Sequence, residues 1–143
     1  MLTKFDFMLM TIHDNLFIED VQDRFSECFP SLKIEFYKDQ PVGEKSLKQD
    51  GLIDPRSRIG DIRNDHTQGM LQIKSTDRTG QVKHWFKNIF GLNVQIFRKE
   101  NNCWVGTTST NKYSLQQQKE FCELSKKCLL PKVEPGFVKS DPG

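Results

Sequence analysis

Two stretches of this sequence decide its fold: MTIHDNLFIEDVQDRFSECFPSLKIEFYK (10–38) and LQIKSTDRTGQVKHWFKNIFGLNVQIFR (71–98). Each begins as a short apolar strand, continues with apolar residues at helical spacing, and ends in alternating apolar and polar residues. Pro30 ends the first predicted helix, because proline cannot continue it. Gly91 ends the second in the usual C-cap manner. We therefore predict a strand, a helix and a strand in each stretch.

The two predicted units match when one is shifted along the other. A shift of 61 positions superimposes the apolar residues of the first strand and helix, and a shift of 60 superimposes the second strand after one extra residue, Ser31. The matched pairs are Ile12 and Ile73, Val21 and Val82, Phe25 and Phe86, Phe29 and Phe90, and Tyr37 and Phe97. One explanation of the match is duplication of a single unit, and the alternative is that any two strand–helix–strand units share an apolar period. Either origin predicts similar architecture.

The remaining segments add a hairpin and a third helix. Residues 100–102 are typical of a tight turn, and 103–110 is then the returning strand. Ser114 and Gln117 form a capping-box pattern, which begins a helix that we expect to run to about Cys128. Residues 39–69 have the composition of a long loop, with a short hairpin or turn within 52–62. We expect one domain over 1–130 and a tail over 131–143.

A doubled βαβ pattern predicts an α+β fold. The expected arrangement is ferredoxin-like (split βαβ), in which both units share one sheet and both helices cover one face of it. The predicted strands 32–38 and 92–98 would then lie outside the central pair. The alternative is a ubiquitin-like β-grasp, because DPRSRIGDI (54–62) followed by GMLQIKS (69–75) is similar to the short turn and last strand of that fold.

The composition limits the classes of partner. The chain has 143 residues, a formal net charge of +2 and 28% charged residues, which is typical of a globular domain and gives no global electrostatic case for nucleic acid or an anionic membrane. Its four cysteines form no C-x-x-C motif. We expect a cytoplasmic protein with no membrane-spanning segment and no secretory signal peptide.

No group of residues has the spacing of a catalytic or metal site. The three histidines, His13, His66 and His84, are far apart and form no ligand pair. Asp61, Asp65 and His66 could meet in a loop, but turns use these residue types routinely. Cys103 and Cys122 have no evident base beside them. We therefore predict a protein that is not an enzyme and that holds no cofactor or metal.

One face of the predicted sheet suggests a binding surface. If both helices cover the face that carries Ile12, Ile34 and Ile73, alternation places Phe7, Tyr37 and Phe97 on the other face. An open face with aromatic residues has three explanations: the C-terminal helix covers it, a protein partner or a second copy binds it, or bases stack on it. We expect a non-enzymatic module that binds a protein or itself through this face or the 39–69 loop, with Phe7, Tyr37, Phe97 and Trp104 as contact residues.

The alternative function is nucleic-acid binding through the basic loop 45–63. That loop carries five basic side chains, interleaved with aspartates. The candidate contacts are Lys45, Lys48, Arg56, Arg58 and Arg63. Mixed charge of this kind is also typical of a solvated loop, and affinity from phosphate contacts would fall with salt.

The stretch FGLNVQIFRKENNCWVGTTSTNKYSLQQQ (90–118) resembles a family of small uncharacterised bacterial proteins, associated with Bacteroidetes-type genomes. The shared pattern is Phe-Gly-Leu, a strand ending in Phe-Arg-Lys, a turn, a tryptophan, a Thr-rich strand and a Ser-Leu helix start. FPSLKIEFYK (29–38) resembles the first half of that family. After about Gln118 the chain departs from the pattern. The resemblance implies an organisation and no activity.

Overall fold

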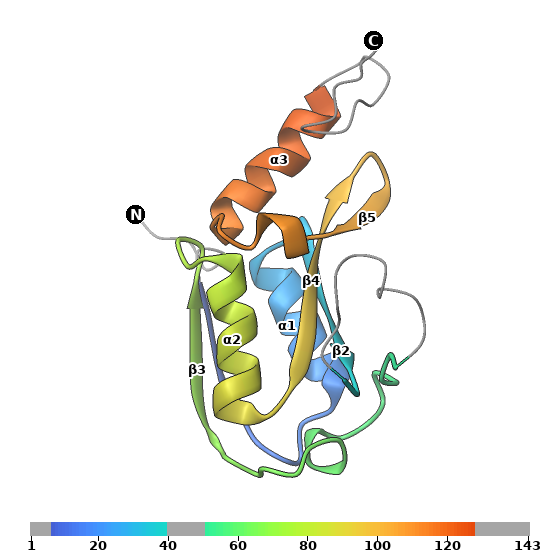
Figure 1. The fold of residues 1–143 in the computed structure, drawn as a ribbon, viewed down its shortest axis with the longest axis vertical. Coiled ribbons are helices and arrows are strands. Elements are labelled where there is room, and N and C mark those ends of the chain that lie inside the picture. The colour runs from blue at the N-terminus through green and yellow to red at the C-terminus, as the bar shows by residue number, and fades with distance from the viewer. Residues whose placement is uncertain (1–6, 40–50, 128–143) are drawn as a thin grey trace.

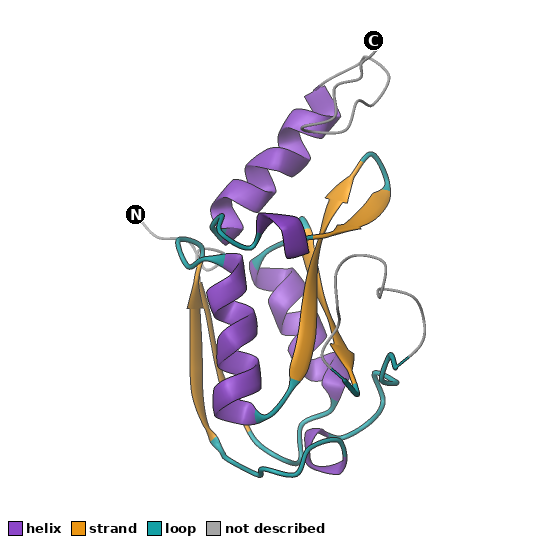
Figure 2. Cartoon of the chain, viewed as in Figure 1, coloured by secondary structure: helices purple, strands orange, loops and turns teal. Residues whose placement is uncertain are grey.

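A computed structural model of the chain describes residues 7–39 and 51–127 (Figure 1). The predicted tail 131–143 and most of the segment 39–50 lie outside the described residues. The predicted α+β class is confirmed, and Figure 2 shows how helices and strands alternate along the chain. The elements are β1 (Phe7–Ile12), α1 (Ile18–Cys28), β2 (Leu32–Tyr37), η2 (Ile59–Asp61), β3 (Gly69–Lys74), α2 (Thr79–Phe90), β4 (Asn93–Glu100), β5 (Cys103–Gly106), η3 (Thr108–Thr110) and α3 (Leu115–Lys127).

The strands form two antiparallel sheets among the described residues. β1 pairs with β3, as predicted for the central pair, whereas β2, β4 and β5 form a separate sheet in that order. The prediction that both units share one sheet is therefore wrong. Figure 1 shows the β1–β3 pair and the β2–β4 pair at opposite sides of the molecule, with α1 and α2 between them. The ubiquitin-like alternative also places its strands in one sheet, and so differs in the same way.

Matched positions of the two units pair with each other in both sheets. Met10 lies opposite Leu71 in the β1–β3 pair, and Glu35 lies opposite Gln95 in the β2–β4 pair. These are the pairs related by the sequence shifts of 61 and 60. Antiparallel strands that meet at matched positions are related locally by a twofold rotation. The two βαβ units therefore face each other across one core.

Local sequence signals set most element ends. Gly91 follows α2 with a φ of 67°, which its missing Cβ permits, and its N–H bonds back to the carbonyl of Lys87. Ser114 and Gln117 form the predicted capping box at the start of α3. Asn101 and Asn102 both have positive φ in the two-residue β4–β5 turn. The predicted strand 103–110 is too long, because the chain leaves the ladder at Gly106 and forms η3.

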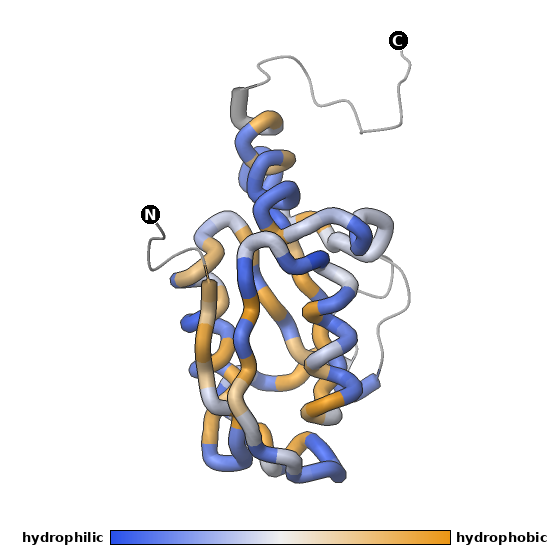
Figure 3. Tube along the Cα trace, turned by 90° about the vertical axis from the view of Figure 1, so that its left-hand side faces the viewer, coloured by the Kyte–Doolittle hydropathy of each residue, from blue (hydrophilic) through white to orange (hydrophobic). Residues whose placement is uncertain are grey.

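The core joins both sheets to both long helices. Met8, Ile12, Leu71 and Ile73 face inward from one sheet, and Leu32, Ile34, Phe36, Val94 and Ile96 from the other. Phe25 of α1 and Phe86 of α2 are fully buried between them. Phe36 and Phe86 pack edge to face with ring centroids 5.9 Å apart. Figure 3 shows apolar residues concentrated on the strands, whereas α3 is mostly hydrophilic.

The helix α3 docks on β4 through a buried polar network rather than through a broad apolar face. Arg98 of β4 donates from Nη1 to Thr110 Oγ1, at 3.1 Å, and to Gln118 Oε1, at 3.0 Å. Its guanidinium also pairs with Glu100 and lies 5.1 Å from the ring centroid of Phe121. A buried guanidinium needs such partners to offset its lost hydration. No helix in the described part of the chain is long and apolar enough to cross a membrane.

We expect substitutions at two positions of α2 to have very different effects on the free energy of unfolding. We expect Phe86→Ala to lower the free energy of unfolding by about 3–5 kcal/mol, because it leaves a cavity among residues of both sheets. Ile89 on the same helix is 46% exposed, and Ile89→Ala should cost less than about 1 kcal/mol. Urea denaturation of both variants measures the two costs. Equal costs would contradict the placement of α2.

Candidate functional site

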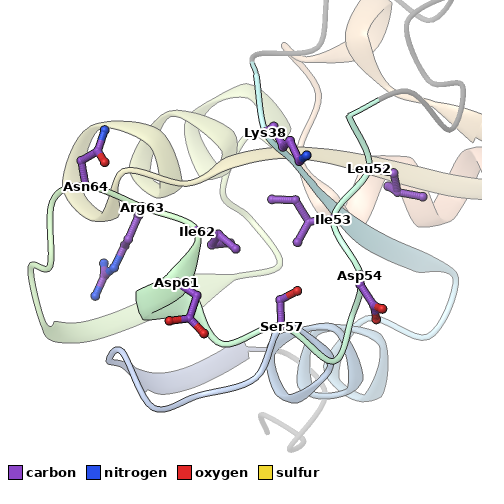
Figure 4. Close-up of a pocket in the computed structure, with 9 residues that line it drawn as sticks. All are labelled: Lys38, Leu52, Ile53, Asp54, Ser57, Asp61, Ile62, Arg63 and Asn64. Carbon is purple, nitrogen blue, oxygen red and sulfur yellow. The ribbon is translucent and has the colours of Figure 1, made fainter.

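An open pocket lies beside η2, between the end of β2 and the segment that leads to β3 (Figure 4). Its volume is about 580 Å³. Ile53 and Ile62 form facing apolar walls, and Leu52 lies at one end. The polar lining comes from Lys38, Asp54, Ser57, Asp61, Arg63 and Asn64.

The wall of this pocket is fixed by backbone hydrogen bonds to the start of α1. The first two amides of that helix have no partner within the helix, and they donate to the loop instead. Ile18 N bonds to Ser57 O and Glu19 N to Pro55 O, each at 2.9 Å. In return, Ile59 N donates to Leu16 O at 2.8 Å. These bonds give a segment without regular secondary structure a defined shape.

A buried arginine ties the far end of the same segment to the body. The Arg63 side chain is fully buried and donates to Asp14 Oδ1, at 2.8 and 3.1 Å, and to the carbonyl of Phe90, at 2.9 Å. His66 Nδ1 lies 2.8 Å from the other oxygen of Asp14. Arg63, helped by His66, holds the pKa of Asp14 below its usual value, against a smaller effect of desolvation. Gly60 is required here, because a Cβ would lie 2.7 Å from Asp14 Cβ.

Several polar groups around the pocket have no side-chain partner among the described residues. The carboxylate of Asp61, the hydroxyl of Ser57 and the ammonium of Lys38 are in this state. Asp54 differs, because Arg56 pairs with it at 3.0 Å and lowers its pKa. Counting only partners within the described residues, the pocket thus offers an unpaired carboxylate and a hydroxyl beside an apolar wall, with an unpaired cation at Lys38.

The acidic and histidine residues of the segment 61–66 bond to different partners. Asp61 lines the pocket, His66 contacts Asp14, and Asp65 accepts from the backbone and hydroxyl of Thr67. Those two bonds from Thr67 lower the pKa of Asp65. No group of three or more His, Cys, Asp or Glu side chains among the described residues could hold a metal ion. Asp61, Asp65 and His66 thus do not share one hydrogen-bonded cluster.

A second surface lies on the outer face of the three-stranded sheet. Trp104 of β5 is 42% exposed, and the ammonium groups of Lys33 and Lys99 lie 4.9 and 5.8 Å from its ring centroid. Lys99 is the direct cross-strand neighbour of Trp104. We call Lys33, Lys99 and Trp104 the tryptophan–lysine surface. It combines a large planar side chain with two positive charges at the edge of the sheet.

Of the four predicted contact residues, two are buried. Tyr37 and Phe97 are only 4% and 7% exposed, so the expected open aromatic face at these positions is wrong. Tyr37 forms a bridge with Leu52, and the Lys33 ammonium lies 5.2 Å from the Phe97 ring centroid. Burial, with the charge of Glu35, raises the pKa of Tyr37 to about 12. Phe7 is half-buried, and Trp104 is well exposed.

The predicted basic cluster does not form a common surface within the described residues. Lys45 and Lys48 lie outside them. Arg63 is buried against Asp14, Arg56 pairs with Asp54, and the Arg58 guanidinium lies 4.7 Å from the ring centroid of Phe17. Each described arginine thus has a local partner. This arrangement weakens the case for phosphate contacts by this loop.

Sequence reasoning missed Lys33, Lys99 and Asp14. Alternation places Lys33 and Lys99 on the outer face, but the approach of both to Trp104 depends on the pairing of three strands. Asp14 stands in a turn sequence, His13-Asp14-Asn15, that predicts only a turn. Its pairing with a residue 49 positions away has no local signal.

No family model matches the chain, and comparisons with curated proteins and with solved structures also give no match.

The Asp14–Arg63 pair predicts a defined dependence of stability on pH. The pKa of Asp14 is lower in the folded state than its ordinary value of 3.8, so its stabilisation is present at neutral pH and is lost as the pH falls below about 4. We expect Asp14→Asn to destabilise the protein at pH 7 and to reduce this loss at low pH. Urea unfolding from pH 7 to pH 3 measures both effects.

Asp23→Asn is the matched control for that experiment. Asp23 is exposed on α1 and makes no side-chain hydrogen bond or ion pair with another described residue. It should leave the pH profile of the wild type unchanged. A wild-type profile in the Asp14→Asn variant would show that the ion pair contributes nothing.

Proposed function

We propose that the chain is a non-enzymatic binding module that engages an acidic segment of a partner protein through the tryptophan–lysine surface. The observation that carries the proposal is the exposed Trp104 ring with two ammonium groups beside it. Tryptophan is enriched among the residues that contribute most to protein interfaces, because it buries a large area in one rigid side chain.

Charge at this surface favours a partner of opposite sign. Lys99 is exposed, and Lys33 forms an ion pair with Glu35 at 3.3 Å, so these three side chains together keep a net positive charge. Two copies of the chain would bring these lysines together, so the surface is better suited to a different, acidic protein than to a homodimer. The net charge of the chain is low, so this attraction is local.

The position of the surface supports binding of an extended segment. Among the described strands β5 is at the edge of its sheet, with β4 on its other side. An edge strand presents unpaired backbone groups that can bond to an added strand. Trp104 is part of this strand, so one bound segment could contact both the backbone and the indole.

Self-association, if it occurs, would use the other sheet. The outer face of the β1–β3 pair carries exposed Leu9 and Met70, and Lys74 is the charged residue on that face. Two copies could meet there with little repulsion. Light scattering, which measures the molar mass in solution, tests this alternative. A dimer that is weakened by the double substitution Leu9→Gln and Met70→Gln would place self-association at the β1–β3 face.

The test selects peptides from a random 12-residue library on the full chain. We expect the selected peptides to be acidic, and Trp104→Ala should weaken the best of them by about tenfold or more. Trp85, the second tryptophan, is half-buried on α2 and serves as the matched control. Trp85→Phe should keep full affinity and leave Trp104 as the single fluorophore for the titration.

Single-stranded nucleic acid is the competing outcome, since bases can stack on an exposed indole. An oligothymidylate titrated in parallel, at two salt concentrations, separates the two. Binding of the oligonucleotide that weakens steeply with salt, with no acidic peptide selected, would overturn the proposal in favour of nucleic acid. Equal affinity of Trp104→Ala and the wild type for the selected peptide would also overturn it.

The fold, the family and the cellular location of the chain can also be proposed. We propose that the fold is ferredoxin-like in its order of elements, although its strands form two sheets; the element order and the antiparallel β1–β3 pair support this. Membership of the family of small bacterial proteins is supported by the pattern in 90–118. A cytoplasmic location is supported by the free cysteines among the described residues, Cys28, Cys103 and Cys122.

A further inference from the structure

The two halves of the molecule place corresponding backbone hydrogen bonds around the starts of α1 and α2. In each half, the first helical amide donates to a later loop, and the loop donates back to the residue before the helix cap. In the first half these bonds are Ile18 N to Ser57 O, at 2.9 Å, and Ile59 N to Leu16 O, at 2.8 Å; in the second half they are Thr79 N to Tyr113 O, at 2.8 Å, and Leu115 N to Asp77 O, at 3.0 Å.

The correspondence continues along the wall of the pocket. The Tyr37–Leu52 bridge in the first half matches the Phe97–Gly106 pair in the second. The bond from Ser57 N to Asp54 O, at 2.9 Å, matches the bond from Tyr113 N to Thr110 O, at 3.1 Å. Three pairs of positions follow from these matches: Lys38 with Arg98, Asp54 with Thr110, and Ile62 with Gln118.

In the second half, the space between these positions holds a guanidinium group. Arg98 Nη1 donates to both Thr110 Oγ1 and Gln118 Oε1, at 3.1 and 3.0 Å. The ring of Phe121 and the carboxylate of Glu100 complete its surroundings. This place in the fold is therefore built to surround a flat cation.

In the first half, the corresponding space is the open pocket. Asp54 and Ile62, the counterparts of the two residues that receive Arg98, both line it. Lys38 stands where Arg98 stands, but it is exposed and bonds to no side chain among the described residues. Arg63 also lines the pocket, but its guanidinium donates to Asp14 and to the carbonyl of Phe90, so this arginine is already held by other partners.

We propose that this pocket binds the guanidinium group of an arginine side chain carried by a partner peptide. The unpaired Asp61 carboxylate and Ser57 hydroxyl supply acceptors, and the apolar walls of Ile53 and Ile62 suit the faces of a guanidinium, which is weakly hydrated. Lys38, which bonds to no side chain in the part of the chain that the structure describes, is a charge that opposes a cation, and its exposed position lets it turn toward solvent. The pocket is independent of the tryptophan–lysine surface.

The test uses the full chain labelled with ¹⁵N. It is titrated with N-acetyl-arginine amide, with N-acetyl-lysine amide, and with a short peptide that contains one arginine. We expect saturable shifts of the amide signals of residues 51–64. The lysine compound should bind more weakly, because an ammonium group lacks the planar set of N–H donors with which a guanidinium forms paired hydrogen bonds. Tighter binding of the peptide than of the single amino acid would identify a peptide as the source of the group.

Two charge variants should act in opposite directions. Asp61→Asn should weaken binding of the arginine compound by about tenfold, because it replaces a hydrogen bond to a charged acceptor. Lys38→Gln should strengthen binding a few-fold by removing the opposing charge. Asp23→Asn and Lys74→Gln, which make the same charge changes at exposed positions away from the pocket, should change nothing. The spectrum itself reports whether each variant is folded.

Several results would overturn the proposal. They are an absence of saturable shifts with the arginine compound and the peptide, shifts confined to residues outside 51–64, or equal affinity in the Asp61→Asn and wild-type proteins. The Trp104→Ala variant should bind the arginine compound as the wild type does. Loss of arginine binding in that variant would place the arginine site at the tryptophan–lysine surface instead.

Discussion

The antiparallel contact between β1 and β3, centred on Met10 and Leu71, is the interaction on which the rest of the structure depends. It joins the starts of two units that are 61 residues apart, and so brings two amphipathic helices to one core. A two-stranded sheet is marginal by itself. It is stable here because Met8, Ile12 and Ile73 pack against the same buried phenylalanines as the opposite sheet. Residues of both units belong to this one core, so each unit covers apolar side chains of the other.

Two buried arginines then fix the segments that follow each unit. Arg63 joins the loop after η2 to Asp14 and to the end of α2, whereas Arg98 joins β4 to η3 and α3. A buried guanidinium is costly without full partners, so each one strongly favours a single arrangement of the chain around it. The two halves share their backbone bonds but use different side chains. This difference leaves a closed polar network in the second half and an open pocket in the first.

The low net charge means that recognition by this chain depends on local groups. Most charged side chains near the pocket are already paired, as Asp54 is with Arg56 and Asp14 with Arg63. Asp61 and Lys38, in contrast, have no side-chain partner among the described residues. On the outer face of the β2–β4–β5 sheet, Lys33 and Lys99 both lie beside the ring of Trp104. Glu35 is the carboxylate that pairs with Lys33, so it balances one of these two positive charges. At the pocket and at the tryptophan–lysine surface, positive and negative charges therefore do not balance locally, although the net charge of the whole chain is low.

The sequence by itself determined the type and order of the elements. Helical spacing and alternation are local properties, so α1, β2, α2 and β4 could be predicted, as could the stops at Pro30 and Gly91 and the capping box at Ser114. It also indicated which residues face the core. Exposed Trp104 was predicted as a contact residue, but its flanking lysines were not.

Only the tertiary structure decided which strands pair and which outer residues are covered. Alternation defines two faces of a strand but does not name its neighbour, so one shared sheet was expected where β2 and β4 in fact pair with each other. Tyr37 and Phe97 face outward by alternation yet are buried; Tyr37 forms a bridge with Leu52, and Lys33 of the neighbouring strand lies over the Phe97 ring. The Asp14–Arg63 pair and the pocket depend in the same way on contacts across tens of residues, and such contacts have no periodic signal in the sequence.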